Sequence, residues 1–352
     1  MKRIAFFQDN LNVGGIQKSL MNLLGNIDYG KYQVDLYLFD QNKFWNNNLP
    51  KEVNIKYLPP ISRIYSFLPF EKAKKSVRLD FSGCEEYDAA IDFNSYQDCC
   101  AIGAISVPAK KRVMWIHNDV EIKLANEWKY RVLWSFFKGK FKYFDQFVGV
   151  SGGLIEPFKK MSGMTDKKYS VIPNFIDADE IRRKMQDNPD DISVDDSCTN
   201  FVALGRLCHQ KGYDIMLDTF KKAFSARPDL RLYIIGDGPD RAMLENKIDS
   251  LGLENKVFLL GNKENPYCYM SKMDAFISTS RYEGQGMNIM EAMVIGLPLY
   301  CSDNLEKYVD GLHGYSNVAE AMVKAGKCDK HPDDLIAYNS SILASFDELT
   351  NI

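Results

Sequence analysis

Two carboxylates bracket a glycine loop late in the chain. Glu283 directly precedes a Gly-Gln-Gly loop (284–286), and Glu291 falls one turn into the helix expected from Met287. The apolar run at residues 275–278 before them is typical of a buried parallel strand. A glycine loop that opens a helix presents free N–H groups and a positive dipole end to a phosphate. One carboxylate can then reach a hydroxylated ring and the other a vicinal diol, an arrangement that suits a sugar nucleotide. An ordinary strand–helix unit with two solvated glutamates is the alternative.

Two permanent cations lie in a similar position earlier in the chain. Arg206 and Lys211 follow a strand expected at residues 201–204, and Gly212 then opens a helix. Such a pair beside a helix N-terminus can neutralise a diphosphate. The next expected strand ends in Gly236-Asp237-Gly238-Pro239. This is not the dinucleotide fingerprint, because Arg241 stands at its third glycine position, so we expect no nicotinamide site.

A glycine pair near the start of the chain is a third candidate. Gly14-Gly15 follows a strand expected at residues 3–8 and precedes a helix expected from Ile16. It fails as a P-loop because Gln17 stands where that motif needs glycine. In open α/β sheets ligands bind at the carboxyl ends of strands, although tight-turn packing is the alternative here. His117 also follows an expected strand (112–116), where a catalytic role competes with a structural one.

We expect neither a metal nor a cofactor. Asp177-Ala178-Asp179 has the form of a DxD metal–nucleotide motif, but it follows a Pro-Asn turn and precedes a helix. Helix capping therefore explains it better. The eight cysteines include no CxxC pair and no histidine at ligand spacing. They fit buried, reduced thiols in a cytoplasmic protein.

Length predicts two domains, because 352 residues exceed the usual size of one core. We expect a first α/β domain at residues 1–173 and a second at residues 174–330. A helix with one apolar face is expected within residues 331–352, and with no strand after it this helix must pack on an element already formed. Further strands are expected at 34–39, 89–93, 147–150, 171–172, 232–235, 257–260 and 299–301.

The charge is divided unevenly along the chain. Residues 1–173 carry 25 Lys and Arg against 18 Asp and Glu, a net +7, whereas the rest carries −10. Residues 127–144 interleave bases with aromatics, as in segments that lie on anionic headgroups; a core helix with a solvated basic side is the alternative. The longest apolar runs fall short of the roughly 20 residues of a membrane span. The apolar start at residues 4–7 is too short for a signal peptide.

In this order the motifs resemble the family-four retaining glycosyltransferases of the GT-B fold. The resemblance spans roughly residues 1–310 and is most specific from Gly205 to Pro298. It implies an α/β protein with two Rossmann-like doubly wound domains facing a cleft, and a C-terminal helix that crosses back to the first domain. The matching motifs are Gly14-Gly15, Ile172-Pro173-Asn174 with Asp177, Gly205-Arg206 with Lys211-Gly212, Gly236-Asp237-Gly238-Pro239, and Glu283-x7-Glu291 with Gly296-Leu297-Pro298.

The resemblance implies roles for the charged residues. Arg206 and Lys211 would grip the diphosphate of the donor. Glu291 would bind the ribose diol, and Glu283 the hydroxyls of the donor sugar. Arg206, Lys211 and Glu283 would act in catalysis as well as binding.

It also implies roles for backbone and for a histidine. The backbone of Gly286, Met287 and Asn288 would face the sugar and phosphate. Gly14-Gly15 would close over the donor from the first domain, and His117 would contact the sugar near the reacting centre. Residues 285–288 differ from the Phe-Gly-Leu-Pro that many relatives carry, which leaves the donor sugar open.

The expected activity is that of a metal-independent, retaining hexosyltransferase. It would move a sugar from a nucleotide-sugar donor, expected to be a UDP-sugar, to a hydroxyl of a glycan or lipid-linked acceptor in cell-surface polysaccharide synthesis. We expect it in the cytoplasm, peripheral at an anionic membrane surface through its first domain, with no nucleic-acid partner. The alternatives are a non-catalytic GT-B partner subunit and a sugar-nucleotide epimerase or hydrolase on the same fold.

Overall fold

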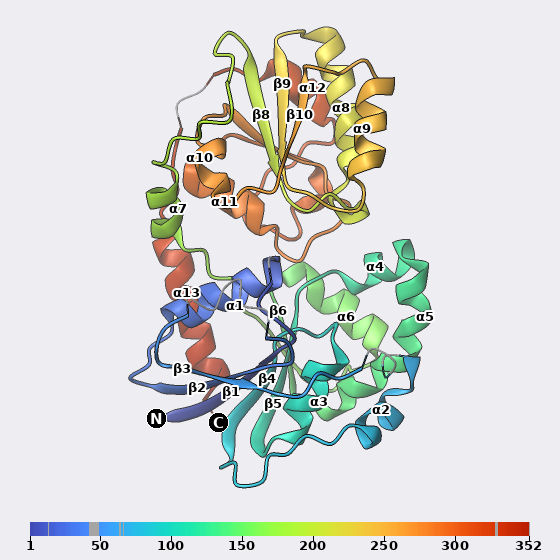
Figure 1. Cartoon of the computed structure of the whole chain (residues 1–352), viewed down its shortest axis with the longest axis vertical. Helices are drawn as coiled ribbons and strands as arrows, with labels where there is room; N and C mark the ends of the chain where they lie inside the picture. Colours follow the sequence, from blue (N-terminus) through green and yellow to red (C-terminus); the bar gives the residue numbers. More distant parts are fainter. Residues whose placement is uncertain (13, 42–48, 63–64, 66, 328–329, 352) are drawn as a thin grey trace. The chain divides into compact units, whose positions relative to one another are not determined.

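The fold is that of a computed structural model, which describes residues 1–12, 14–41, 49–62, 65, 67–327 and 330–351, without the side chains of Lys129 and Phe137. The chain divides into two compact units (Figure 1). The first comprises residues 1–175 together with 337–352, and the second comprises residues 176–336. The first boundary thus lies two residues beyond the expected one, and the tail returns to the first unit from Ala337.

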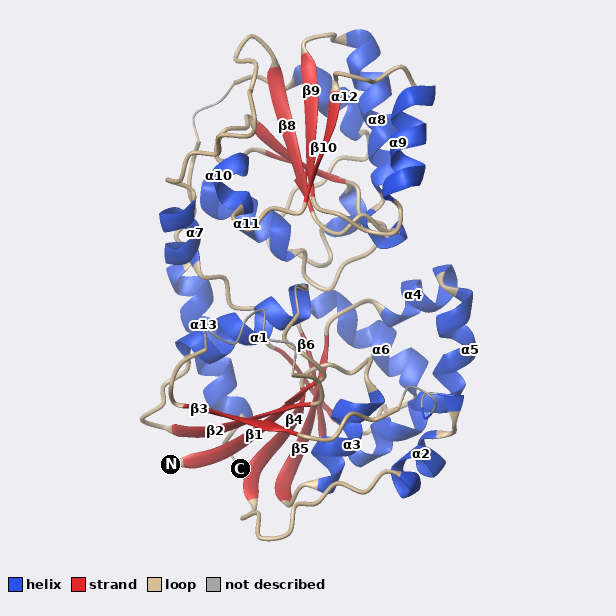
Figure 2. Cartoon of the chain, viewed as in Figure 1, coloured by secondary structure: helices blue, strands red, loops and turns tan. Residues whose placement is uncertain are grey.

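The first unit contains a seven-stranded, wholly parallel sheet in the order β3-β2-β1-β4-β5-β6-β7. Helices flank its strands in Figure 2. Such strands are buried on both faces, which explains continuous apolar runs such as Ile4–Phe7. The strands are β1 (Lys2–Gln8), β2 (Tyr32–Leu38), β3 (Val53–Tyr57), β4 (Tyr87–Asp92), β5 (Ala109–Ile116), β6 (Gln146–Gly149) and β7 (Lys168–Val171).

The sequence did not predict β3. In this edge strand Val53 is buried, whereas Asn54 and Tyr57 are exposed, so no apolar run marks it. The expected short strand at 171–172 is β7, which begins three residues earlier at Lys168.

The helices of the first unit follow the expected alternation with strands. Its last helix, α13, packs on the strands through Phe346, whose ring stacks on Phe6 with centroids 6.1 Å apart. Beside it, the Tyr32 hydroxyl donates to Asp347 at 2.6 Å. The helices are α1 (Gly15–Asn26), α2 (Phe70–Ser76), α3 (Asp98–Ser106), α4 (Val120–Asn126), α5 (Trp128–Phe137), α6 (Ile155–Ser162), α13 (Ile336–Leu349) and the 3-10 helices η3 (Lys138–Tyr143) and η4 (Gly152–Leu154).

The aromatic and basic segment at α5 and η3 is partly core and partly surface. Trp134, Phe141 and Phe144 are buried. Buried Lys140 donates to Asp98 at 2.9 Å, so this base is not available to a surface. In contrast, the Trp128 side chain is 69% exposed. Among the described residues no helix combines the length and apolar character needed to cross a membrane.

The second unit contains a five-stranded parallel sheet in the order β10-β9-β8-β11-β12. Its strands are β8 (Thr199–Leu204), β9 (Leu230–Ile235), β10 (Val257–Gly261), β11 (Ala275–Ser278) and β12 (Leu299–Cys301). Its helices are α7 (Ala178–Lys184), α8 (Tyr213–Ala226), α9 (Arg241–Ser250), α10 (Pro266–Met270), α11 (Met287–Ile295), α12 (Val318–Lys324) and the 3-10 helices η5 (His209–Lys211) and η6 (Asp303–Leu305).

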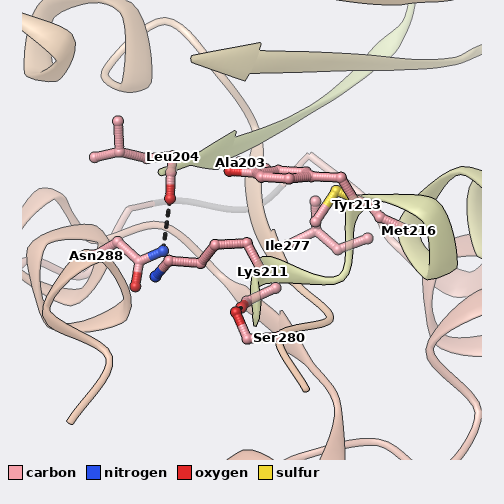
Figure 3. Close-up of a pocket in the computed structure, with 9 residues that line it drawn as sticks. Ala203, Leu204, Lys211, Tyr213, Met216, Ile277, Ser280 and Asn288 are labelled. Carbon is pink, nitrogen blue, oxygen red and sulfur yellow. Dashed lines mark hydrogen bonds between the residues drawn. The ribbon is translucent and has the colours of Figure 1, made fainter. Parts of the chain in front are cut away.

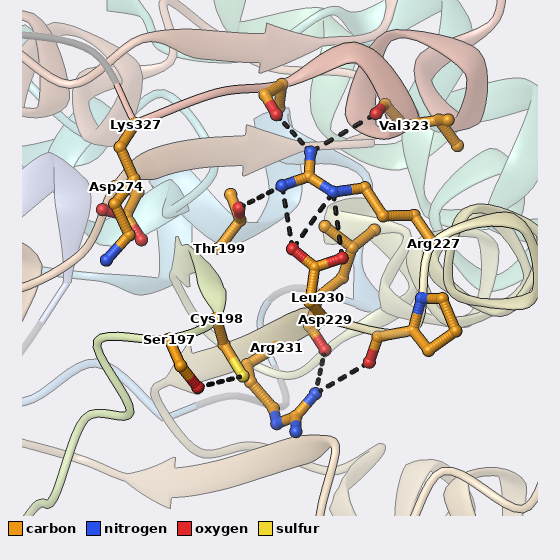
Figure 4. Close-up of polar contacts among 12 residues, drawn as sticks. Ser197, Cys198, Thr199, Arg227, Asp229, Leu230, Arg231, Asp274, Val323 and Lys327 are labelled. Carbon is orange, nitrogen blue, oxygen red and sulfur yellow. Dashed lines mark hydrogen bonds and ion pairs between the residues drawn. The ribbon is translucent and has the colours of Figure 1, made fainter.

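A hydrogen-bonded network closes the amino edge of this second sheet (Figure 4). The Arg227 guanidinium donates to both carboxylate oxygens of Asp229 and to Thr199 at the start of β8. It also donates to the carbonyls of Val323 and Ala325 at the end of α12. This edge is therefore held by bonds within the protein.

Candidate active site

The charged candidates of the second unit gather at the carboxyl edge of its sheet. Arg206 follows β8, Glu283 follows β11, and these two strands are neighbours. From β8 the chain first adds β9 and β10 on one side and then crosses to β11 on the other. The carboxyl ends of β8 and β11 therefore form the topological switch point, where ligands bind in open α/β sheets.

Two close backbone contacts shape the loop that carries Arg206. A Cβ on Gly236 would lie 2.1 Å from the Gly205 carbonyl oxygen, and one on Gly238 would lie 2.3 Å from the Leu207 carbonyl oxygen. The Leu207 N–H also donates to the Asp237 carbonyl at 3.0 Å. The Gly-Asp-Gly-Pro motif is thus a support for the loop after β8. On that loop the Arg206 side chain is exposed and makes no ion pair with a described residue.

Lys211 ends η5, and its side chain runs along the same loop. It lines a small pocket with residues from the ends of β8 and β11, among them Leu204 and Ile277 (Figure 3). Gly205 (φ +150°) leaves room for this chain, since a Cβ there would lie 3.2 Å from Lys211 Cε. Lys211 is followed by Gly212 (φ +64°), where a Cβ would lie 2.2 Å from the Thr279 carbonyl oxygen. Only glycine fits this turn.

Lys211 and Glu283 form an ion pair. The Lys211 ammonium lies 2.8 Å from Oε1 of Glu283, and both side chains are largely enclosed. The two residues were selected separately from the sequence, one for a phosphate and one for a sugar. The structure joins them into one polar unit, in which each charge compensates the burial of the other.

The glycine loop after Glu283 ends in a left-handed residue that starts α11. Gly286 (φ +71°) is the N-cap, so Met287 and Asn288 provide the first N–H groups of the helix. The Asn288 amide donates to the Leu204 carbonyl at 2.6 Å, which fixes this helix start to the end of β8 (Figure 3). The arrangement gives an anion the N–H groups and dipole of a helix N-terminus beside two cations.

An ion pair supports the base of this loop. Arg281 donates to both carboxylate oxygens of Asp214, at 2.8 and 2.6 Å, and this pairing lowers the pKa of Asp214. The Arg281 N–H donates to the Gln210 carbonyl at 2.8 Å. The loop that carries Lys211 and the loop that carries Glu283 are therefore bonded to each other.

Glu291 lies further along α11 and is buried. Its Oε1 accepts a hydrogen bond from the hydroxyl of Tyr267, at 3.2 Å. The sequence pattern predicted Glu291 but not Tyr267. That tyrosine lies 24 residues earlier, in the short helix α10, and no motif marks it.

The three remaining candidates belong to the first unit. Gly14 is the N-cap of α1 in an extended conformation, and exposed Gly15 begins the helix. A Cβ on Gly15 would meet no atom within 4 Å, so its backbone is open on that side. A Cβ on Gly14, in contrast, would lie 2.4 Å from Oε1 of Gln17.

His117 follows β5 and is buried. Its Nε2 lies 2.9 Å from the Phe93 carbonyl oxygen, and since a carbonyl accepts, Nε2 carries the proton. Burial lowers the pKa of His117 to about 3. The ring is therefore neutral near pH 7, with Nδ1 as its acceptor, and it is unsuited to donate a proton there.

A cluster of hydrogen-bond acceptors lies at the switch point of the first sheet, between β1 and β4. Asp9 accepts from the side-chain amides of Gln8, Asn10 and Asn94. Asp92 is buried, and burial raises its pKa to about 7. Oxygens of Gln8, Asp92 and Asn94 there have no hydrogen-bond partner among the described residues. Sequence patterns gave no indication of this cluster.

The Asp177-Ala178-Asp179 motif is a helix cap, as expected. Oδ1 of Asp177 accepts from the Glu180 N–H at 2.8 Å and caps α7. The Asp179 side chain is exposed and pairs with Arg182. Within the described part of the chain no cluster of three or more His, Cys, Asp or Glu could hold a metal ion. Cys328 lies outside the described residues.

Comparison with known proteins gives sequence matches over the second unit. Residues 186–322 match the family described as "Glycosyl transferases group 1". An uncharacterized glycosyltransferase of Methanocaldococcus jannaschii is 27% identical over 198 residues, 55% of this chain and 48% of that protein. The N-acetylgalactosamine-N,N'-diacetylbacillosaminyl-diphospho-undecaprenol 4-alpha-N-acetylgalactosaminyltransferase of Campylobacter jejuni is 30% identical over 154 residues, 44% of this chain and 40% of that protein. The chain thus spans less than half the length of these relatives.

A solved structure confirms the predicted fold class. The chain resembles a mutant TarM of S. aureus, solved in complex with Fondaparinux, alpha-GlcNAc-glycerol and UDP. The TM-score is 0.69 at 12% identity, with 100% of each chain covered. At that identity the likeness establishes the fold alone. The chain has the GT-B fold, and its residues 186–322 match the group 1 glycosyl transferases.

Proposed function

We propose that the protein is a retaining glycosyltransferase that moves a hexose-type sugar from a nucleotide-sugar donor to an acceptor hydroxyl. The observation that carries this is the carboxyl edge of the second sheet. There Arg206, the Lys211–Glu283 pair and the start of α11 surround one switch point. Two cations and a helix N-terminus suit a diphosphate, and the buried carboxylates suit hydroxyl groups.

The donor is proposed to be a UDP-sugar. The TarM structure contains UDP, which supports a uridine nucleotide on this fold. Because Arg206 is exposed and forms no ion pair with a described residue, it can turn toward the diphosphate. Lys211 is already fixed by Glu283, so it offers one N–H to Glu283 and others to phosphate oxygens.

The chemistry is proposed to depend on charge stabilisation. As the glycosidic bond breaks, negative charge develops on the departing diphosphate, and Arg206, Lys211 and the α11 N–H groups are placed to stabilise it. In a retaining transfer of the kind the family resemblance implies, that diphosphate takes the acceptor proton on the same face of the sugar. Neutral His117 would then contact the sugar without transferring a proton.

The acceptor is proposed to be a glycan or lipid-linked hydroxyl. The Campylobacter relative has a diphospho-undecaprenol acceptor in its name, which supports a lipid-linked class. The first unit would reach it from an anionic membrane surface. Trp128, Val132 and Lys138 of the aromatic and basic segment are exposed, and they are proposed to make this contact. Co-sedimentation with anionic vesicles at low salt tests it, and failure to bind there would contradict membrane docking.

A panel of nucleotide sugars tests the proposed function most directly. A UDP-, GDP- or ADP-sugar should raise the melting temperature of the full chain, because a ligand that binds the native state stabilises it. Transfer should then require a hydroxyl acceptor. Sugar release to water alone would instead favour the hydrolase alternative, and the absence of any nucleotide binding would favour a non-catalytic subunit.

A further inference from the structure

Tyr267 is a buried side chain in direct contact with a proposed donor-binding carboxylate. Its hydroxyl donates to Oε1 of Glu291 at 3.2 Å. Tyr267 is 3% exposed and Glu291 is 4% exposed. A hydrogen bond to an ionised acceptor in such surroundings is stronger than one between neutral groups, so it restricts the orientation of the carboxylate.

The backbone that carries Tyr267 is itself held in place. Pro266 occupies the first turn of α10, and the side chain of Asn265 caps the helix by accepting from the Tyr267 N–H at 3.2 Å. The Asn265 amide also donates to the Lys184 carbonyl at 2.8 Å and to Asp187 at 2.7 Å. The phenol therefore has a fixed position, against which the carboxylate of Glu291 is aligned.

An aligned, enclosed carboxylate discriminates between ligands that do and do not bring hydroxyl groups. A carboxylate has about four lone-pair sites, of which the bond from Tyr267 uses one. When a ligand lacks one hydroxyl, a carboxylate that can turn to water loses little. A buried carboxylate that is held in one orientation cannot turn to water. A ligand that lacks one hydroxyl then leaves an oxygen of this carboxylate without a donor, and it binds more weakly for that reason.

We propose that Tyr267 is a positioning residue that makes this site select ribonucleoside diphosphate sugars over 2′-deoxyribonucleoside ones. This inference rests on the proposed function, in which Glu291 accepts from the ribose diol. It assigns the donor to the UDP-, GDP- or ADP-sugar class and excludes dTDP-sugars. Tyr267 acts through Glu291 and does not itself contact the reacting atoms.

Binding of paired nucleotides to the full chain tests this inference. The probe is whichever of UDP, GDP and ADP binds the wild type, together with its 2′-deoxy counterpart, measured by calorimetry. The wild type should bind the deoxy form at least about tenfold more weakly, the usual effect of losing a charge-assisted hydrogen bond. Tyr267→Phe should bring the two affinities to within about threefold, mainly by weakening the ribonucleotide.

The same helix offers a matched control. Tyr269 is in α10 too, and its hydroxyl donates to Asp191 at 2.6 Å. Tyr269→Phe removes the same atom from the same helix and should keep the wild-type ratio. Should Tyr267→Phe not fold, Tyr267→Met gives the same measurement with a side chain that adapts to irregular space.

Three results would be decisive. An unchanged ratio in a folded Tyr267 variant overturns the positioning role. Equal binding of ribo and deoxy forms by the wild type overturns the donor class. Binding of dTDP but of none of the three ribonucleotides would overturn the donor class as well. These results differ from the failure of UDP, GDP, ADP and dTDP all to bind the wild type, which would overturn the proposed function itself.

Discussion

The carboxyl edges of the two sheets differ in charge although they are built alike. Each sheet is parallel and has a switch point, between β1 and β4 in one and between β8 and β11 in the other. The second edge presents Arg206, Lys211 and a helix N-terminus. The first presents acceptors, with Asp9 and Asp92 at its centre. One fold thus supplies an edge suited to an anion and an edge suited to groups that donate hydrogen bonds.

The difference teaches that the residues placed at strand ends, and not the fold, set the chemistry of each unit. An anionic diphosphate would meet repulsion from Asp9 and Asp92, whereas a neutral hydroxyl would not. The amino edge of the second sheet shows a third case. There Arg227 is charged too, but five acceptors in the protein already bind it, so it is a structural residue.

The largest expected effect is loss of activity when the cationic edge is changed. Arg206→Ala and Lys211→Ala should each reduce transition-state stabilisation by about 2–4 kcal/mol, the range for removing one preorganised donor. Steady-state kcat/KM measures it. The two variants should differ in stability, because only Lys211 neutralises a buried carboxylate, Glu283.

A double variant controls for that difference. Lys211→Met with Glu283→Gln removes both charges, so it should regain melting temperature but not activity. Wild-type turnover in Arg206→Ala or in Lys211→Ala would show that the cationic edge is not part of the catalytic site.

The buried acceptors at the carboxyl edge of the first sheet should make the free energy of unfolding depend on pH. The pKa of Asp92 is about 7 in the folded protein, against 3.8 for the ordinary group, because burial disfavours its charge. Between these values the folded state binds more protons than the unfolded state, so the free energy of unfolding falls as pH rises from about 4 to 7. Asp92→Asn should remove this slope and stabilise the protein at pH 8 by on the order of 2–4 kcal/mol.

His117 contributes the opposite slope in an overlapping range. Its folded pKa of about 3 lies below the ordinary 6.5, so the unfolded state binds more protons and stability falls as pH drops below 6.5. Urea unfolding at pH 5, 6, 7 and 8, compared between wild type and Asp92→Asn, separates the two. A parallel pH dependence in both proteins would contradict the buried titration of Asp92.

Substitution of the two glutamates at the carboxyl edge of the second sheet should have smaller effects, which differ between donor binding and transfer rate. Glu291→Gln should weaken donor binding by about 1.5–3 kcal/mol, the contribution of charge-assisted hydrogen bonds. Glu283→Gln should mainly slow transfer, since a contact to the sugar tightens as the glycosidic bond breaks. Separate measurement of the donor dissociation constant and of single-turnover rates distinguishes them. Changes in the donor KM alone for both variants would contradict this division.

The sequence predicted what is encoded locally. Strands such as β1, β8 and β11 are buried on both faces, so their apolar runs are continuous and easily recognised. Once a strand is located, the loop at its carboxyl end is located too. Edge strand β3 was not predicted, because its exposed residues interrupt the run of apolar residues. Arg206, Lys211 and Glu283 were recognised because charged residues stood close to glycines after expected strands, and Glu291 because it falls one turn into the helix that follows.

Contacts that depend on packing were not predictable in this way. Tyr267 meets Glu291 across 24 residues, and Gly238 supports Leu207 from a different loop. The Lys211–Glu283 pair crosses 72 residues. Neither spacing nor residue type marks such pairs, because they arise only when β8 and β11 become neighbours in the sheet. Parallel pairing brings distant loops to one edge.

The smallest expected effect is the response to metal removal, which also sharpens the contrast between the edges. The cationic edge already places Arg206, Lys211 and the start of α11 where a divalent ion would otherwise neutralise the diphosphate. The acceptor edge has carboxylates, but three side-chain amides occupy Asp9. Transfer should therefore continue at an unchanged rate in excess EDTA. Its loss, with recovery on adding Mn²⁺, would mean that the two cations are insufficient and that a carboxylate of the chain binds a metal with the donor.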